Sequence, residues 1–225
     1  MSITGGQKRR MFELNPNRKL YRDTLLDSDV FIIDDFYDNP DEVKDYLEHP
    51  LPPLWKQNIK QLGRHGNNGF YFEDRRLQDH NLDLMKVYDY LSILCDQPPA
   101  GRSDWVQSNM TRFIDEEYNT YDTCHWWPHI DYGYNGIVYL NYDGCNGTNI
   151  YDVVSRRELQ ERPADEHEEP WRDKSRYKVM KELIPKYNRM VLFDGTFPHG
   201  MNISNDRFFN HDYRINQVFF FKPDK

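Results

Sequence analysis

The sequence is poor in cysteine and has no long apolar run. Its three cysteines, Cys95, Cys124 and Cys145, form an odd set without CxxC spacing. Such a set disfavours a disulfide framework and a zinc knuckle, so we expect ordinary thiols in a reducing compartment. No segment approaches the roughly 20 apolar residues that a membrane-spanning helix needs. Because no apolar segment follows the basic residues near the start either, we expect a cytoplasmic protein with no membrane partner.

Positive charge is also scarce relative to negative charge. The 225 residues include 29 Lys and Arg against 37 Asp and Glu, which gives a formal net charge of −8 at pH 7. The sequence pI is about 5.5. This balance disfavours bulk attraction to nucleic acid or to anionic lipid. Nucleic acid is therefore a disfavoured partner, and a polyanionic substrate would require a local basic groove.

Aromatic side chains are abundant although the overall hydrophobic content is low. Aromatic residues make up 15% of the chain and hydrophobic residues 38%, with a mean hydropathy of −0.93. Phe and Tyr bury large areas and favour strands, so we expect an aromatic core that is mainly β. The length predicts one domain at residues 30–225, after an N-terminal extension at 1–29 and with a charged insertion at about 155–187.

Local patterns predict helices in the first half of the chain. The apolar, β-branched segment 30–36 predicts a strand, and Asn39 is suited to cap a helix that begins at Pro40, with Glu42 three residues after the cap. A second helix is predicted over 79–95 by apolar residues at helical spacing. These residues are Leu84, Val87, Tyr88, Leu91 and Leu94.

The second half of the chain has short segments with the composition of strands. They are residues 105–114, 129–142, 148–154, 188–195 and 213–221. Together with the two helices they predict an α+β protein that is mainly β. No internal repeat or low-complexity tract is present.

The most specific pattern lies in the segment HWWPHIDYGYNGIVYLNY, residues 125–142. If this segment is a strand, His129 and Asp131 project from the same face because alternate side chains share a face. His199, just after another predicted strand and a turn, is the best candidate for a third ligand. Two histidines and one carboxylate on one side of an ion are typical of non-haem Fe(II) oxygenases, in which the remaining positions stay open.

Two other interpretations of these residues compete with the iron site. A bare His-x-Asp pattern is common by chance. His125 and His129 have the spacing of zinc-protease histidines, but that motif needs a helix and a Glu after the first histidine, and here Pro128 interrupts the segment. A zinc protease is therefore disfavoured.

A buried cation is predicted on the last strand. Arg214 opens an otherwise apolar strand, and alternation puts Asn216, Val218 and Phe220 on its face. An inward guanidinium needs an anion, and Arg is suited to bind a carboxylate through two parallel hydrogen bonds. A salt bridge to one of the many acidic residues is the structural alternative.

Taken in order, these motifs resemble those of the 2-oxoglutarate- and Fe(II)-dependent dioxygenase superfamily, nearest its prolyl-hydroxylase-like branch. The resemblance covers roughly residues 30–224. Its motifs are His129-x-Asp131, Tyr139-Leu140-Asn141, Asn146-Gly147-Thr148, Leu192-Phe193 with Pro198-His199, and Arg214-x-Asn216 with Phe219 to Phe221. It implies a double-stranded β-helix (jelly roll) barrel with supporting N-terminal helices.

The resemblance also implies roles for single residues. His129, Asp131 and His199 would be the catalytic metal ligands, while Arg214, assisted by Tyr139, would bind the distal carboxylate of 2-oxoglutarate. Asn216, at the other predicted cofactor-binding position, stands where many members have Ser or Thr. The number of residues between His199 and Arg214 is larger than is usual in the family. Arg207, eight residues after His199, is therefore a rival candidate for binding the distal carboxylate of 2-oxoglutarate. The implied cofactors are Fe(II) and 2-oxoglutarate, with O2 as oxidant and ascorbate in support.

The function that we expect is hydroxylation of a protein side chain or an amino-acid-like substrate, with release of succinate and CO2. One alternative is a non-catalytic metal-binding β-helix module in binding or assembly. Another is a nucleic-acid demethylase of the same superfamily, which would need a basic rim. The insertion at 155–187 could be a lid or a solvated surface loop, and the sequence does not indicate the substrate, the pathway or the oligomeric state.

Overall fold

The computed structural model describes residues 11–49, 56–62, 70–79, 84–96, 105–113, 121–142, 146–152, 171–207 and 212–221. Within these ranges, only the backbone is considered for residues 56–62, 70–79, 105–109, 113 and 221. Two α-helices and thirteen strands are present in the described part of the chain, so the protein is mainly β.

The bounds of the elements are as follows. The helices are α2 (Pro40–Glu48), α3 (Met85–Leu94) and a short 3-10 helix, η3 (Lys174–Arg176). The first seven strands are β1 (Lys19–Leu25), β2 (Ser28–Asp34), β3 (Lys56–Leu62), β4 (Phe70–Asp79), β5 (Trp105–Phe113), β6 (Cys124–Trp126) and β7 (Tyr134–Tyr139). The other strands are β8 (Thr148–Tyr151), β9 (Trp171–Asp173), β10 (Val179–Leu183), β11 (Arg189–Asp194), β12 (His199–Met201) and β13 (Arg214–Phe221).

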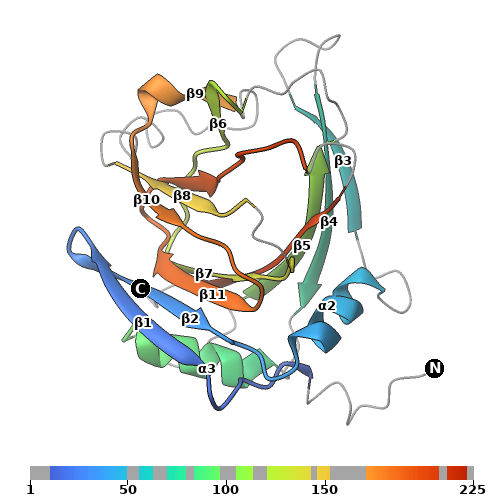
Figure 1. Ribbon diagram of the computed structural model, residues 1–225, viewed down its shortest axis with the longest axis vertical. Coiled ribbons are helices and arrows are strands. Elements are labelled where there is room, and N and C mark those ends of the chain that lie inside the picture. Colours follow the sequence, from blue (N-terminus) through green and yellow to red (C-terminus); the bar gives the residue numbers. More distant parts are fainter. Residues whose placement is uncertain are drawn as a thin grey trace.

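The strands form one large antiparallel sheet and two smaller ones. The large sheet has eight strands in the order β1-β2-β11-β7-β13-β5-β4-β3, and a three-stranded sheet has the order β10-β8-β12. Strands β6 and β9 form a separate pair. In Figure 1, β8 and β10 lie across the interior from β7 and β11, while α2 and α3 lie outside the large sheet. The described strands do not close into a hydrogen-bonded ring, because β1 and β3 end the large sheet and β10 and β12 end the small one.

The outer face of the large sheet packs against the helices. Val138 of β7 and Leu140, the residue just after β7, belong to the same buried cluster as Val43 of α2 and Leu91 of α3. Each of these four side chains is fully buried. Burial of such a side chain stabilises a fold by roughly 1.5 to 3 kcal/mol, so this layer fixes the helices on the sheet.

The inner face of the large sheet packs against the small sheet. Ile137 and Tyr139, which alternate with the outward residues of β7, form a second buried cluster with Val191 of β11 and Ile150 of β8. The two-residue period of β7 therefore separates a helix-facing layer from an interior layer. The candidate functional residues lie on this interior side.

Helix α2 begins where the sequence predicts. Asn39 is its N-cap and accepts a hydrogen bond from the main-chain N–H of Glu42, and Pro40 occupies the first helical position. Val43 and Leu47 form its buried face. The local sequence is sufficient to set this boundary because capping involves groups only three residues apart.

Helix α3 is shorter than predicted. The prediction began at Asp79, but that residue is the last of β4, and the helix runs over Met85–Leu94. The apolar stripe itself is confirmed, since Leu84, Val87, Tyr88 and Leu91 are buried and Leu94 packs partly buried against the same core. The spacing identified the buried face, but it did not identify the end of the preceding strand.

The strands predicted from apolar composition are confirmed, and others were missed. Strands β5, β7, β8, β11 and β13 lie in predicted segments, and β2 overlaps the segment predicted at 30–36 but begins at Ser28. The strands that were not predicted are β1, β3, β4, β6, β9, β10 and β12. The predicted domain boundary at residue 30 falls inside β2, and β1 pairs with β2 along its whole length. Of the predicted insertion, residues 155–170 lie outside the described ranges, while the remainder contains β9 and β10.

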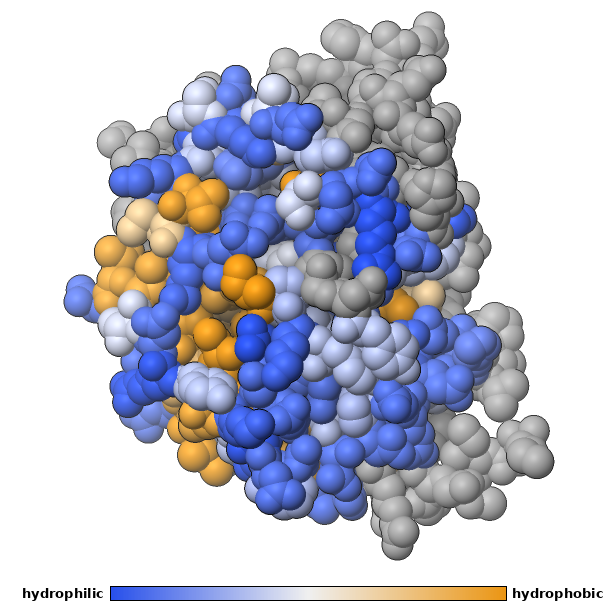
Figure 2. Space-filling model, viewed as in Figure 1, coloured by the Kyte–Doolittle hydropathy of each residue, from blue (hydrophilic) through white to orange (hydrophobic). Residues whose placement is uncertain are grey.

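The surface seen in Figure 2 is mostly hydrophilic, with a hydrophobic patch over β1 and β10. An ion pair between Lys181 of β10 and Asp23 of β1 joins the two strands. Exposed apolar residues of these strands and the turns after them are Leu20, Leu26, Val179, Met180 and Ile184.

Two further sequence expectations concern cysteines and membrane spans. Cys95 and Cys124 form no disulfide bond in the described part of the chain, and burial raises the pKa of the Cys95 thiol to about 12. Cys145 lies outside the described residues. No helix in the described ranges combines the length and apolar character needed to cross a bilayer.

Candidate metal centre

Two chain segments bring the three predicted ligands together. His129 and Asp131 lie between β6 and β7, and His199 is the first residue of β12. The main-chain N–H of each histidine donates to the carbonyl oxygen of the other, with both N–O distances 2.8 Å. The N–H of Asp131 donates to the carbonyl of Gly195, also at 2.8 Å. Backbone hydrogen bonds therefore hold both segments at a fixed register.

The prediction that His129 and Asp131 share a strand is wrong in detail. Residues 130–133 lie outside any strand, and His129 makes only an isolated bridge before β7 begins at Tyr134. The two side chains still lie on the same side of this segment. The bridge between His129 and His199 and the hydrogen bond from Asp131 to Gly195 hold the backbone here in place of the regular hydrogen bonds of a strand. A two-residue spacing is therefore compatible with convergence in a segment that is not a strand.

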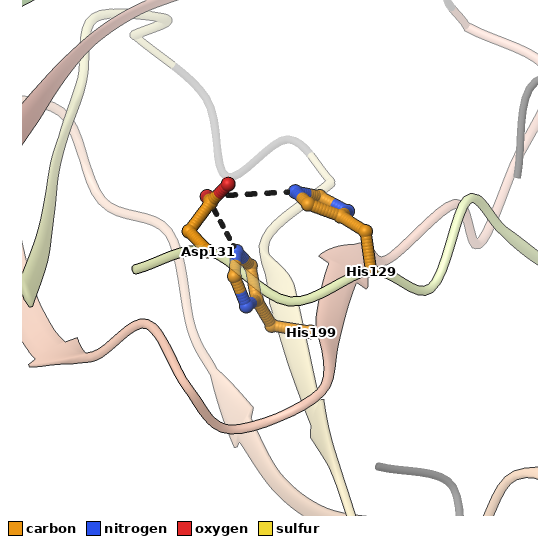
Figure 3. Close-up of side chains that lie close together, drawn as sticks. All are labelled: His129, Asp131 and His199. Atoms are coloured by element: carbon orange, nitrogen blue, oxygen red, sulfur yellow. Dashed lines mark ion pairs between the residues drawn. The ribbon is translucent and has the colours of Figure 1, made fainter. Parts of the chain in front are cut away.

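The side chains of the triad point toward one another (Figure 3). One ligand atom from each of His129, Asp131 and His199 lies within 4.8 Å of the others. Asp131 Oδ2 is 3.7 Å from His129 Nε2 and 3.4 Å from His199 Nε2. The His199 side chain is 4% exposed, whereas those of His129 and Asp131 are 31% and 29% exposed. The group is accessible from one side and closed on the side of His199.

The hydrogen bonds of the two imidazoles orient their nitrogens in the same way. His129 Nδ1 donates to the carbonyl of Trp127 at 2.8 Å, and His199 Nδ1 donates to the carbonyl of Phe197 at 2.8 Å. A neutral imidazole that donates through Nδ1 has its lone pair on Nε2. In metal-binding histidines, a hydrogen bond from the ring nitrogen that does not bind the metal fixes the tautomer and the ring orientation. Both rings thus present Nε2 toward Asp131.

The carboxylate of Asp131 is held in its charged form. Burial raises its pKa, but the hydrogen bond from His199 and the charges of His129 and His199 when these rings are protonated, together with a hydrogen bond from Asn135, outweigh burial and lower that pKa well below its usual range. A metal ligand of this type must be deprotonated. The three residues therefore offer one anionic oxygen and two imidazole lone pairs, a donor set that suits Fe(II) among divalent metals.

Gly200 lets the two segments approach closely. A Cβ atom at Gly200 would lie 2.6 Å from the carbonyl oxygen of Trp126 and 3.1 Å from that of Trp127. Trp127 itself has a positive φ of 45°, which is uncommon for a residue other than glycine. The carbonyl group of Trp127 is the one that accepts the hydrogen bond from His129 Nδ1.

Arg214 lies in the same interior and is buried. Its Nε donates to the carbonyl of Asn146 at 3.1 Å, and its guanidinium carbon lies 5.7 Å from the ring centroid of Tyr139. No carboxylate among the described residues lies within ion-pairing distance of it. A buried cation without an anionic partner is costly, so this position favours the binding of an external anion.

Tyr139 and Asn216, the other two predicted cofactor contacts, lie beside Arg214. Tyr139 is opposite Asn216 on the neighbouring strand, and its hydroxyl is 2.9 Å from that of Thr148. Asn216 is 3% exposed, and its Oδ1 has no hydrogen-bond partner within the described ranges. These polar groups line the inner face together with Arg214.

Arg207 is in a different environment. Its Nε donates to Asp212 at 3.2 Å, and its side chain is 30% exposed. The carboxylate of Asp212 thus balances the charge of Arg207 at the surface, whereas Arg214 has no such partner among the described residues. The surroundings favour Arg214 as the anion-binding residue.

Asn135, which was not predicted from the sequence, lies at the triad. Its Nδ2 is 2.6 Å from Asp131 Oδ2 and 3.2 Å from His199 Nε2. The available signal was a polar residue four positions after Asp131, on the face of β7 that otherwise carries Ile137 and Tyr139.

Comparison with known proteins finds a distant structural similarity. No protein-family model matches the chain, and no curated protein is similar to it in sequence. Among solved structures, it is similar to a crystal structure described as an oxidoreductase of the 2OG-Fe(II) oxygenase family from Burkholderia pseudomallei. The match covers 82% of this chain and 78% of that chain, with 13% sequence identity and a TM-score of 0.38.

Proposed function

We propose that this protein is an Fe(II)- and 2-oxoglutarate-dependent dioxygenase that hydroxylates a protein side chain or an amino-acid-like substrate. The observation that carries the proposal is the convergence of His129, Asp131 and His199 within 4.8 Å of one another. Two imidazoles and one carboxylate leave room at an ion for a chelating co-substrate and for oxygen. We further assign the two facing sheets to a double-stranded β-helix of the prolyl-hydroxylase-like branch.

The residues present fit the metal. The Nε2 atoms of His129 and His199 and the Oδ2 atom of Asp131 would hold it, because the Nδ1 atoms of both rings are already used as hydrogen-bond donors. When bound, iron and 2-oxoglutarate supply the oxidising chemistry, in which O2, 2-oxoglutarate and a substrate C–H give succinate, CO2 and a hydroxylated product. The protein holds the ligands and limits the access of water.

Arg214 would bind the far carboxylate of 2-oxoglutarate. Its guanidinium can donate two parallel hydrogen bonds to a carboxylate, and its position over the Tyr139 ring supports the planar group from one side. The hydroxyl groups of Tyr139 and Thr148, which lie 2.9 Å apart, are further polar groups at this end of the interior. Asn216 contributes a buried amide at the same end of the interior.

Apolar groups on the closed side of the triad would shield it from water. The ring of Phe193 contacts that of His199 edge-on at 5.1 Å between centroids. Phe197, whose carbonyl accepts the His199 Nδ1 proton, is buried in the same cluster. Exclusion of water strengthens electrostatic interactions in such a site. The exposed edges of His129 and Asp131 would then face the substrate.

Turnover of 2-oxoglutarate tests the proposal. The full chain with Fe(II), ascorbate and O2 should form succinate from 2-oxoglutarate, slowly without substrate and faster with a substrate found in a panel of peptides and amino acids. His199→Ala should abolish succinate formation, and the exposed His49→Ala should not change it. Metal binding without succinate would instead support a non-catalytic module. Stimulation by methylated oligonucleotides and not by the panel would support a nucleic-acid demethylase.

A further inference from the structure

Asn135 is a buried polar residue in direct contact with the candidate ligands. It is the second residue of β7, and its side chain is 1% exposed. Its Nδ2 lies 2.6 Å from Asp131 Oδ2, which is the oxygen that faces both imidazoles. The same nitrogen is 3.2 Å from His199 Nε2. The amide group therefore contacts two of the three ligand atoms.

We propose that Asn135 is a positioning residue of the metal centre, whose N–H holds Asp131 Oδ2 between the two histidines; this inference rests on the proposed metal site. Asp131 lies in a segment outside any strand, and its side chain is 29% exposed. A carboxylate there has free rotation about its side-chain bonds unless a second group restrains it. One N–H satisfies one lone pair of Oδ2 and leaves another directed at the ion.

Asn135 is itself held rigidly by its strand neighbours. It is opposite Phe193 of β11 and Phe220 of β13, so backbone pairing fixes it on both sides. A Cβ atom at Gly195 would come within 3.0 Å of Asn135 Oδ1, so the absence of a side chain at Gly195 gives the amide its space. The rigid strand thus positions a ligand that belongs to a more irregular segment.

The contacts of the Asn135 side-chain amide indicate that its N–H group, and not its oxygen, faces the candidate ligands. Asn135 Oδ1 is buried and has no hydrogen-bond partner among the described residues, whereas Nδ2 contacts Asp131 and His199. Leaving a buried carbonyl unpaired costs free energy, and an asparagine kept only for packing would have both ends satisfied. The opposite orientation would put a carbonyl oxygen 2.6 Å from a carboxylate oxygen, where the two would repel. The contact with Asp131 therefore selects the N–H end.

The alternative role for Asn135 is that of a fourth metal ligand through its oxygen. This role and the positioning role differ in their dependence on Asp131. If Asn135 acts by donating to Asp131, its effect on metal affinity disappears when Asp131 is absent. If Asn135 is a direct ligand, its effect on metal affinity remains. A double-mutant cycle separates the two, because residues in one network show a coupling that independent residues lack.

Ni(II) titration calorimetry on the full chain provides the test, because Ni(II) binds nitrogen ligands more tightly than Fe(II) and so keeps weakened sites measurable. The proteins are wild type, Asn135→Leu, Asp131→Ala and the double variant. Asn135→Leu keeps the size of the side chain, and Asn135→Ala serves as a second variant if leucine does not fit. We expect Asn135→Leu to weaken Ni(II) binding about 10- to 100-fold. In the Asp131→Ala background it should have no further effect.

A structural asparagine provides the matched control. Asn188 is also buried and bonds to both the main-chain N–H and the carbonyl of Tyr37. Asn188→Ala should lower the melting temperature without weakening Ni(II) binding. If Asn135→Leu and Asn135→Ala bind Ni(II) as wild type does, the positioning role is wrong while the metal centre stands. A loss that persists without Asp131 would make Asn135 a direct ligand, and a wild type that binds no Ni(II) would overturn the metal centre itself.

Discussion

His129 and His199 are joined by two reciprocal main-chain hydrogen bonds, each with an N–O distance of 2.8 Å. Both rings also donate from Nδ1 to the carbonyl of the residue two positions earlier. The two imidazoles therefore lie side by side, 4.4 Å apart between centroids, before any ion is considered. The backbone register of β12 against the segment before β7 determines the geometry of the candidate ligands.

Substitution of Gly200 should disrupt this register. In Gly200→Ala the new Cβ would be 2.6 Å from the carbonyl oxygen of Trp126, a main-chain atom that cannot move without its segment. We expect a loss of about 1 to 3 kcal/mol in the free energy of unfolding. We also expect the stabilisation that Mn(II) gives the wild type to disappear, because His129 and His199 would no longer align. Thermal denaturation with and without Mn(II) measures both effects.

Gly136→Ala is the matched control for this prediction. Its Cβ would meet the terminal methyl of Met190 at 2.4 Å, the end of a flexible side chain on the outer face of the sheet. It should lower stability without changing the increase in melting temperature caused by Mn(II). An unchanged Mn(II) response in Gly200→Ala would mean that the register does not control the site.

Arg214 and Arg207 should differ in their effect on 2-oxoglutarate binding. Arg214→Met keeps much of the side-chain volume but removes a buried cation, and we expect about a 10- to 100-fold loss of affinity because hydrogen bonds to charged groups contribute about 1.5 to 3 kcal/mol. Mn(II) affinity should stay unchanged. Arg207→Ala, which removes the half-buried ion-pair partner of Asp212, should leave both affinities unchanged. Titration of 2-oxoglutarate into the Mn(II)-loaded proteins measures these values, and the reverse ranking would identify Arg207 as the anchor.

His125 should make the protein less stable in mild acid. Burial lowers its pKa to about 4, the charge of Lys174 acts in the same direction, and a hydrogen bond with the main chain of Tyr177 opposes them. In the unfolded chain the histidine pKa is about 6.5, so between pH 6.5 and 4 the unfolded chain binds more protons at His125 than the folded protein does. The contribution of neutral His125 to the free energy of unfolding is fully present above pH 6.5. It declines as the pH falls to 4, by at most about 3 kcal/mol.

Urea denaturation at pH 7.0 and 4.5 measures this dependence. His125→Gln should lose less stability between the two pH values than the wild type, because glutamine does not titrate. His49→Gln changes an exposed histidine and should follow the wild type. An equal loss in all three proteins would assign the acid sensitivity to the carboxylates alone.

The sequence predicts best those features that depend on near neighbours. The cap of α2 involves Asn39 and Glu42, and the buried stripe of α3 follows from its spacing, so both could be predicted. Strands β3 and β4 were missed because their sequences are rich in charged and amide residues. Their strand conformation comes from pairing between strands, since β3 pairs with β4 and β4 pairs with β5. A pattern within one segment does not contain that information.

The candidate site shows the same division. The sequence indicates which residue types belong together, but the expectation that His129 and Asp131 share a strand is wrong in detail because separate backbone contacts to His199 and Gly195 hold them. Asn135 was missed because its contact with Asp131 depends on how the chain turns between them at residues 132 and 133. The roles assigned to the triad and to Arg214 stay predictions until ligand binding is measured.

Anaerobic equilibrium dialysis of the full chain against Fe(II) and labelled 2-oxoglutarate tests the central claim most directly. We predict one iron per chain and one 2-oxoglutarate per iron, with both lost in His199→Ala. Iron retained at the wild-type level by His199→Ala, or 2-oxoglutarate bound equally well without iron, would contradict the proposed metal centre.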